Sequence, residues 1–200
     1  MLKHLLVPLV GSPLAESGLP AASYLATHLG AAVTLVHVIE EDAPGEVHSQ
    51  PHLTNEEGAR AYLERVSAGA FSNDLAVDWH VHTSEVRDVA RSLAEHGGEF
   101  GSDLIVMCTH GHGGLRDWLY GSIAQQVIGS GRKPVLLIQP HSAGPAAEFV
   151  CRTLLTPVDD GEDHGTGLAL SVELALACEA ELHLLRVVHT RGTLPGERAL

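Results

Sequence analysis

The stretch from Asp103 to Pro140, DLIVMCTHGHGGLRDWLYGSIAQQVIGSGRKPVLLIQP, decides how the rest of the chain can fold. Its first apolar run, Leu104 to Met107, is short enough to be a buried strand. A glycine-rich loop from His110 to Gly114 follows. Gly121 and Ser122 then open a segment with helical spacing of apolar residues, so the stretch begins as strand, loop and helix.

The second half of this stretch completes a βαβ unit. A cluster of breaker residues, Gly129 to Pro134, ends the helix, and Val135 to Ile138 form a second apolar strand. In such a unit the free N–H groups and the positive end of the helix dipole face one point. The pattern therefore predicts an anion site at Gly111, Gly121 and Ser122. The same residues also fit a plain turn followed by a capped helix.

Composition and charge narrow the class of protein. A chain of 200 residues with 44% hydrophobic and 18% charged residues is globular and forms one domain or slightly more. Aromatic residues make up only 4%, so the core is built from aliphatic side chains, as in a parallel sheet covered by helices. The net charge of −13 would repel DNA or RNA, so we expect no nucleic-acid partner.

The cysteines and the apolar runs indicate a cytoplasmic protein. Cys108, Cys151 and Cys178 are odd in number and far apart, and no CxxC pattern occurs. No apolar run reaches the roughly 18–20 residues of a membrane span, and the N-terminal run is too short for a signal peptide. We therefore expect a reducing compartment and no membrane partner.

Apolar strands alternate with helical segments along the first 140 residues. Strands are expected at 5–10, 32–39, 75–82, 104–107 and 135–138, and helices at 14–29, 55–68, 85–96 and from 122. Helix boundaries are expected at Ser12, at Thr54 with Glu57, at Ser84, and at Gly97 with Gly98. The alternation predicts an α/β fold, a doubly wound five-stranded parallel sheet with 75–82 as an edge strand. A ligand is then expected at the carboxyl ends of the first and fourth strands.

The last fifty residues repeat the beginning of the chain. With Pro157 aligned on Pro8, LLTPVDD falls on LLVPLVG and LHLLRVV falls on VTLVHVI. Apolar positions that match over this length predict a second copy of the same unit. We therefore expect a complete domain over residues 1–140, a linker over 141–149, and a partial second copy, one βαβ unit, over 150–200.

Taken together, these motifs resemble the universal stress protein family. The shared features are the strand LLVPL followed by GSPLAE, the strand TLVHV, the stretch DLIVMCTHGHGGL, the GS pair and the closing strand KPVLLI. The resemblance covers the first copy along its whole length. It implies an adenine-nucleotide alpha-hydrolase-like, Rossmann-like fold and a regulatory role in the stress response.

The resemblance also implies a ligand. In nucleotide-binding members, the loop reads Gly, two residues, Gly, nine residues, Gly, then Ser or Thr. By position, these features fall on Gly111, Gly121 and Ser122 here, and an adenosine-contacting valine falls on Val38. The resemblance thus implies ATP or AMP, with Mg²⁺, as the cofactor.

Two positions depart from the family pattern. Cys108 stands at the first loop glycine, and Val10 stands where the family has an aspartate that holds the adenosine. A left-handed backbone at Cys108 would cost about 1–2 kcal/mol. A ligand group left unpaired at Val10 would cost about 1–3 kcal/mol, and a buried strand position is the plain interpretation of this valine. The second copy has the acid, Asp159, but no loop to accompany it.

The histidines give no catalytic or metal site by sequence alone. His80 and His82 are two apart on a strand and share a face, and His110 and His112 lie on the glycine loop. Nothing in the sequence brings the two pairs together, so we expect solvent-facing histidines and no metal. No acid is placed to orient a histidine toward Ser122. We therefore expect a protein that is not an enzyme, with ATP hydrolysis slow at most.

Two hypotheses about function follow. In the first, the chain is a stress-response regulator that binds ATP or AMP at the glycine loop. In the second, the same fold has lost its nucleotide and acts as an interaction or scaffolding protein through dimerisation. The family resemblance implies a homodimer through the last strand, Val135 to Ile138.

Overall fold

The computed structural model of the chain describes residues 1–42, 46–47, 50–51, 53–109, 122–131, 133–139, 148–158 and 165–187. The chain divides into two compact units, Met1–Val150 and Cys151–Leu200. Each unit has a sheet of its own.

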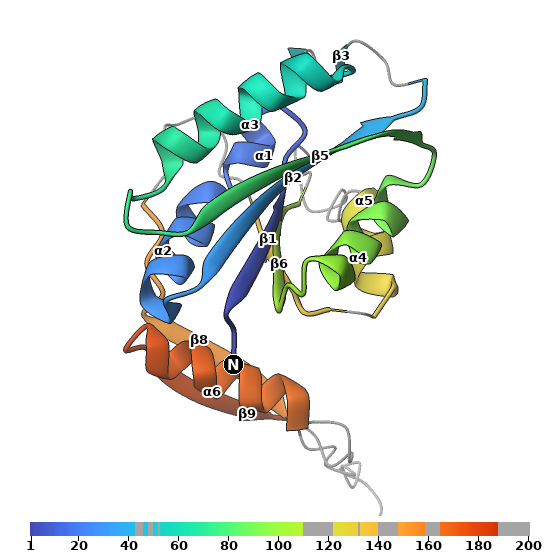
Figure 1. Cartoon of the computed structure of the whole chain (residues 1–200). Helices are drawn as coiled ribbons and strands as arrows, with labels where there is room; N and C mark the ends of the chain where they lie inside the picture. Colours follow the sequence, from blue (N-terminus) through green and yellow to red (C-terminus); the bar gives the residue numbers. More distant parts are fainter. Residues whose placement is uncertain are drawn as a thin grey trace, which may run out of the picture. The chain divides into compact units, whose positions relative to one another are not determined.

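Five parallel strands form the sheet of the first unit, in the order β5-β2-β1-β6-β7 (Figure 1). The strands are β1 (His4–Pro8), β2 (Ala32–Glu40), β5 (Val77–Val86), β6 (Leu104–Cys108) and β7 (Val135–Ile138). The expected doubly wound sheet is confirmed, and β5 lies at an edge as its alternating pattern predicts. The stretch expected to be a long loop also contains a short antiparallel hairpin, β3 (Glu46–Val47) with β4 (Gln50–Pro51).

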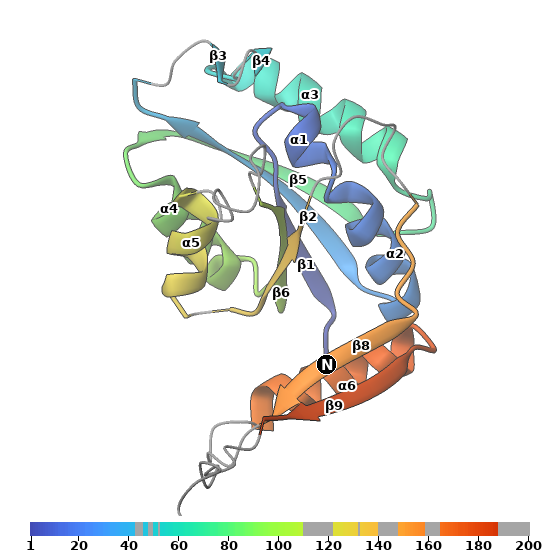
Figure 2. The ribbon, with the colours of Figure 1, turned by 180° about the vertical axis from the view of Figure 1, so that it is seen from behind.

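Helices cover both faces of this sheet. They are α1 (Pro13–Glu16), α2 (Leu19–Leu29), α3 (Glu56–Ala70), α4 (Val89–Glu99) and α5 (Ser122–Gly129). Helices α1, α2 and α3 lie on one face, and α4 and α5 lie on the other (Figures 1 and 2). Burial on both faces explains why the inner strands β1, β2 and β6 are mostly apolar. In the part of the chain that the structure describes, no helix is long and apolar enough to cross a membrane.

The first helical segment is broken, although the sequence predicts one helix over 14–29. Ser12 caps α1 as expected, because its hydroxyl accepts a hydrogen bond from the Ala15 N–H at 3.2 Å. The break falls between α1 and α2, and Pro20 stands in the first turn of α2. Proline has no N–H to donate and is tolerated only in a first turn, so a new helix has to begin there.

Two predicted helix caps are wrong, and a polar residue further along the chain takes each place. Asn55, not Thr54, caps α3 by accepting from the Gly58 N–H at 2.8 Å. Asp88, not Ser84, caps α4 by accepting from the Arg91 N–H at 2.9 Å. Ser84 belongs to β5, which continues to Val86 because that residue pairs with Glu40 of β2.

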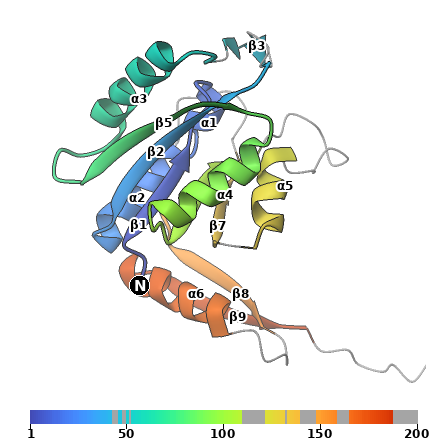
Figure 3. The same ribbon diagram turned by 45° about the vertical axis from the view of Figure 1, so that its right-hand side comes forward.

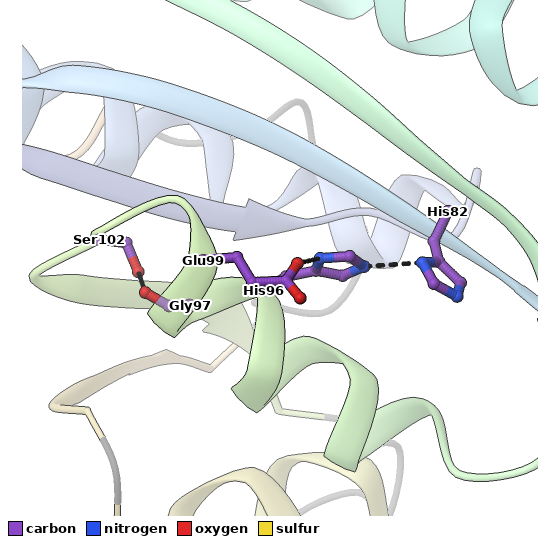
Figure 4. Close-up of polar contacts among 5 residues, drawn as sticks. All are labelled: His82, His96, Gly97, Glu99 and Ser102. Carbon is purple, nitrogen blue, oxygen red and sulfur yellow. Dashed lines mark hydrogen bonds and ion pairs between the residues drawn. The ribbon is translucent and has the colours of Figure 1, made fainter.

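The end of α4 also differs from the prediction, since Gly97 and Gly98 lie inside the helix. The Ser102 hydroxyl donates to the Gly97 carbonyl at 3.0 Å (Figure 4). A Cβ atom on Gly97 would lie 3.4 Å from that hydroxyl oxygen, so this glycine allows a close approach to the following turn. The chain leaves the helix after Glu99, and Gly101 provides the positive φ of +64°.

The second unit is a single βαβ arrangement. Strands β8 (Thr153–Val158) and β9 (Glu181–Arg186) pair in parallel, and α6 (Gly165–Ala177) connects them and packs on both (Figure 3). A sheet of two strands buries little apolar surface, and several large apolar side chains of the second unit are exposed. These are Leu155, Val172, Leu176, Leu184, Leu185 and Val187.

Candidate functional site

The sheet of the first unit has one topological switch point, between its neighbouring strands β1 and β6. From β1 the chain crosses to β2 on one side, and from β6 it crosses to β7 on the other. The two crossovers diverge beyond the carboxyl ends of β1 and β6, and such a point is where ligands bind in open α/β sheets. The prediction that the first and fourth long strands meet at the switch point is therefore confirmed for the fold, and a ligand site there stays a prediction.

A tight turn follows β1 at this edge. Gly11 has a φ of +87°, and a Cβ atom there would lie 2.7 Å from Leu53 Cγ. Glycine is therefore required at this position for both its backbone angle and its contact. Ser12 comes next and begins α1, so the turn redirects the chain from the sheet edge onto the helix face.

A buried histidine holds this turn to the loop before α3. His37 lies in β2 and is only 1% exposed. Its Nδ1 lies 2.8 Å from the Leu9 carbonyl oxygen, and its Nε2 lies 3.0 Å from the Leu53 carbonyl oxygen. A neutral imidazole can donate to one of these oxygens, whereas an imidazolium can donate to both. The geometry thus couples the end of β1 to Leu53 through one ring.

Cys108, at the position of the first loop glycine, is the last residue of β6 and is 7% exposed. Its Sγ lies 3.0 Å from Ser17 Oγ and donates to the Ala15 carbonyl at 3.3 Å. Burial raises the pKa of this thiol, although the contact with Ser17 opposes the shift. Among described residues other than glycine, only Asp42 and Glu179 have a positive φ. The backbone of Cys108 is therefore not left-handed and does not carry the strain considered above.

The two valines at this edge offer no polar group. Val38 is 7% exposed and belongs to the core that β2 forms with α4 and α5. Val10 is partly buried and lies two residues beyond the end of β1 at Pro8, so its interpretation as a buried strand residue is wrong. The carboxylate acceptor that the family pattern has at position 10 is therefore replaced by an aliphatic side chain.

The glycine loop itself lies outside the described residues. The predicted site residues Gly111 and Gly121 and the loop histidines His110 and His112 are therefore not described. Asp159 of the second unit also lies outside the described residues. Helix α5 begins at Ser122, as the pattern predicts, but the side chain of this residue is not among those described. The structure thus places the start of α5 and leaves the loop contacts as predictions.

Tyr62 is a residue that the sequence patterns did not single out as functional. It projects from α3, is 6% exposed, and has a hydroxyl with no hydrogen-bond partner among the described residues. Burial, and then the nearby charge of Glu16, raise its pKa above the ordinary range. The sequence did offer one signal for this residue: Tyr62 carries a polar hydroxyl on a helix face that is otherwise apolar.

Comparison with known proteins identifies the family. A family model described as the universal stress protein family matches residues 1–139. The chain belongs to the universal stress protein family. Universal stress protein MJ0531 from Methanocaldococcus jannaschii is 30% identical over 146 residues, which cover 68% of this chain and 82% of that relative.

Solved structures agree with the family assignment. The structure of hypothetical protein MJ0577 has a TM-score of 0.56 and 26% sequence identity, and covers 72% of this chain and 99% of its own. A universal stress protein from Archaeoglobus fulgidus DSM 4304 has a TM-score of 0.71 at 16% identity, and covers 93% of this chain and 67% of its own. The similarity to the Archaeoglobus fulgidus protein concerns the fold alone, and it extends over most of this chain.

A second polar cluster in this universal stress protein lies away from the switch point. His80 and His82 share one face of β5, as expected. The histidine that joins them is His96 of α4, and the predicted loop histidines lie outside the described residues. Sequence spacing does not reveal the third member, because the crossover from β5 to α4 brings it there.

Proposed function

We propose that this universal stress protein is a regulatory protein that binds an adenine nucleotide, ATP or AMP with Mg²⁺, at the carboxyl edge of its sheet. The observation that carries the proposal is the switch point between β1 and β6, from which the chain passes to the start of α5 at Ser122. A helix start at such a point offers unpaired N–H groups and a positive dipole end to a phosphate.

The described residues fit a phosphate group better than an adenosine. Leu53 already fills the space beside Gly11 at the turn after β1, and the thiol of Cys108 is engaged with α1 and Ser17. Val10 offers no acceptor for a ribose or base, and an unpaired ligand group there would cost about 1–3 kcal/mol. Nucleotide affinity is then reduced about 5- to 150-fold relative to a site with a carboxylate.

In this proposal, the backbone of Gly111 and Gly121 and the hydroxyl of Ser122 hold the phosphates, and Val38 lies toward the adenosine. Bound nucleotide would alter which partners the protein binds. Hydrolysis would be slow at most, so the role is that of a sensor.

A titration of the whole chain tests this function. Isothermal titration calorimetry with ATP and Mg²⁺ should give weak binding, and Val10→Asp should tighten it about 5- to 150-fold. Val10→Leu is the matched control and should leave the affinity unchanged, because it keeps the site apolar. If neither the natural chain nor Val10→Asp responds to millimolar nucleotide, the proposal is wrong.

A nucleotide-free scaffolding role is the second candidate, and the exposed edge of the sheet favours it. All four residues of β7 (Val135–Ile138) are partly exposed, and β7 pairs on one side only. An edge strand of this kind is a template for pairing with a second copy. In a sedimentation experiment, Ile138→Lys should then shift a dimer toward monomer, while Val150→Lys, outside the sheet, should not.

We also propose that the second unit is a partial second copy of the first. The order β8, α6, β9 repeats the order of β1, α2 and β2, and the sequence alignment on Pro8 and Pro157 gives the same correspondence. The correspondence also explains the apolar side chains of Leu184 and Leu185, which are exposed on β9, whereas the matching strand β2 is buried within its sheet.

A further inference from the structure

Three histidines meet where the edge strand β5 faces helix α4. His80 and His82 come from alternate positions of β5, and His96 comes from the last turns of α4. One ring nitrogen of each lies within 4.8 Å of the others. In the described part of the chain, no other group of three or more His, Cys, Asp or Glu side chains converges in this way.

The ring of His96 is oriented by a carboxylate. Its Nδ1–H donates to Glu99 Oε2 at 2.8 Å, within the same helix (Figure 4). This contact leaves the Nε2 lone pair directed at His82, whose Nδ1 lies 2.9 Å away (Figure 4). Histidines that bind metals commonly donate their other N–H to a carboxylate, which fixes the tautomer and raises the basicity of the ligand nitrogen.

Aromatic packing holds the cluster in place and leaves one side open. His96 stacks on Phe100 with ring centroids 5.3 Å apart, and His80 meets the same ring edge-on at 5.2 Å. His96 is only 6% exposed, whereas the two histidines of β5 are partly exposed. An ion could therefore enter from the strand side and meet a ring that is already positioned.

The surroundings of His80 favour its neutral form, which is the form that binds a metal. Burial lowers the pKa of His80, and the nearby His96 and His82 lower it further, because adjacent imidazolium charges repel. The carboxylate of Glu99 raises the pKa of His80, and the guanidinium of Arg60 lowers it, as the other two histidines do. Neutral imidazole is the common metal ligand in proteins.

We propose that His80, His82 and His96 form a binding site for a divalent transition-metal ion, with Zn²⁺ as the expected ion. Zinc–nitrogen bonds of about 2.0–2.1 Å place the nitrogens of a tetrahedral site about 3.3–3.4 Å apart. The pair now at 2.9 Å has to open slightly, and the widest pair has to close by less than about 1.5 Å. Rotation of the partly exposed rings on β5 can supply both changes.

The proton balance of this site is simple. The metal takes the position of the proton between His82 Nδ1 and His96 Nε2, and His82 keeps its one proton on Nε2 instead. The three rings leave a fourth coordination position open to water, and Glu99 stays as the outer partner of His96. Mg²⁺ and Ca²⁺ prefer oxygen ligands and should not compete with Zn²⁺.

Bound Zn²⁺ would join β5 to α4 and stabilise the fold.

The test uses the whole chain after EDTA treatment and gel filtration, with Zn²⁺ followed by calorimetry and Co²⁺ by visible absorption. We expect one ion per chain at this site, a rise in melting temperature, and a loss of affinity of at least about tenfold in each of His80→Gln, His82→Gln and His96→Gln. His28→Gln is the matched control, because that histidine lies on α2 and bonds the Tyr24 carbonyl. The Zn²⁺ affinity of His28→Gln should equal that of the natural chain.

A positioning role for Glu99 gives a second readout. Glu99→Gln should weaken Zn²⁺ about 10- to 100-fold and still give one ion per chain and the Co²⁺ spectrum of a nitrogen-ligated site. If His96→Gln fails to fold, the two variants on the half-exposed strand still decide the matter. Unchanged Zn²⁺ affinity and Co²⁺ spectrum in both His80→Gln and His82→Gln would overturn the proposal, as would the absence of Zn²⁺ binding to the natural chain.

Discussion

His82 Nδ1 lies 2.9 Å from His96 Nε2, although the two residues are 14 positions apart and belong to a strand and a helix. Because His96 already donates to Glu99 through Nδ1, its Nε2 accepts the proton of His82 in the neutral state. A further proton on this group of rings would place like charges side by side. The hydrogen bond between the two rings therefore joins α4 to β5.

This arrangement predicts that acid destabilises the metal-free fold. Burial, followed by the charges of His96 and His82, lowers the pKa of His80 in the folded chain below its ordinary value of 6.5. The unfolded chain then binds more protons than the folded chain as the pH falls through this range, so the stabilising contribution is present above about pH 6.5 and is lost below it. Urea unfolding at about pH 7.5 and about pH 5.5 in EDTA should show a smaller pH dependence for His80→Gln. Equal dependence in both proteins would contradict the prediction.

The helix caps give a prediction about stability. Asn55→Ala and Asp88→Ala each remove the side chain that accepts from an N–H of the first turn, so each should cost about 0.5–2 kcal/mol of the free energy of unfolding. Thr54→Ala and Ser84→Ala are the matched controls, since neither residue caps a helix, and each should cost much less. Chemical denaturation of the four variants measures this directly, and a reversed order would contradict the assigned caps.

The same caps show where sequence patterns were sufficient and where they were not. Apolar runs predicted four of the five strands of the first sheet, because strands buried on both faces are mostly apolar, and the alternating pattern predicted β5 at the edge. The capping residues were harder, because Thr54 and Asn55 both suit the position and only the final path of the chain selects one. Pro20 could have predicted the break before α2, because proline is disfavoured in the interior of a helix.

The candidate sites divide in a similar way. Cys108 was placed correctly at the end of β6, and Val10 follows the neighbouring β1 by two residues, because the alternation of strands and helices fixes which strand ends share an edge. The direction of the Cys108 thiol toward Ser17 depends on how α1 packs, which no local pattern contains. His96 was missed for the same reason, since its helical spacing marks it only as a residue near the core.

Cys108 should react slowly with thiol reagents in the folded protein. Its raised pKa keeps the thiol protonated near neutral pH, and its burial against Ser17 and Ala15 blocks access. A colorimetric disulfide reagent should label Cys151, which is more exposed, before it labels Cys108. Urea should remove the difference. Cys178 is also buried, so Cys108→Ser serves to identify the part of the slow phase that belongs to Cys108. Fast labelling of Cys108 without denaturant would contradict the structure.

Tyr62→Phe should leave the protein equally stable or more stable. The hydroxyl is buried without a partner among the described residues, and leaving such a group unpaired costs about 1–3 kcal/mol. Removal of the hydroxyl therefore removes a cost, while the ring continues to pack in α3. Thermal unfolding of the variant checks this. A loss of more than about 1 kcal/mol would mean that the hydroxyl has a partner after all, with Glu16 as the first residue to examine.

The apolar surface of the second unit should be detectable in solution. Leu176 of α6 is 76% exposed and Leu184 of β9 is 57% exposed, and full burial of such a side chain is worth about 1.5–3 kcal/mol. Surfaces of this kind bind apolar dyes or promote self-association. Leu176→Gln with Leu184→Lys in the whole chain should therefore reduce dye fluorescence and the apparent mass at high concentration. Ile128→Lys, at a 43% exposed position of α5, is the control for a single exposed apolar residue and should change both much less. Equal effects of the double variant and this control would show that the second unit presents no such surface.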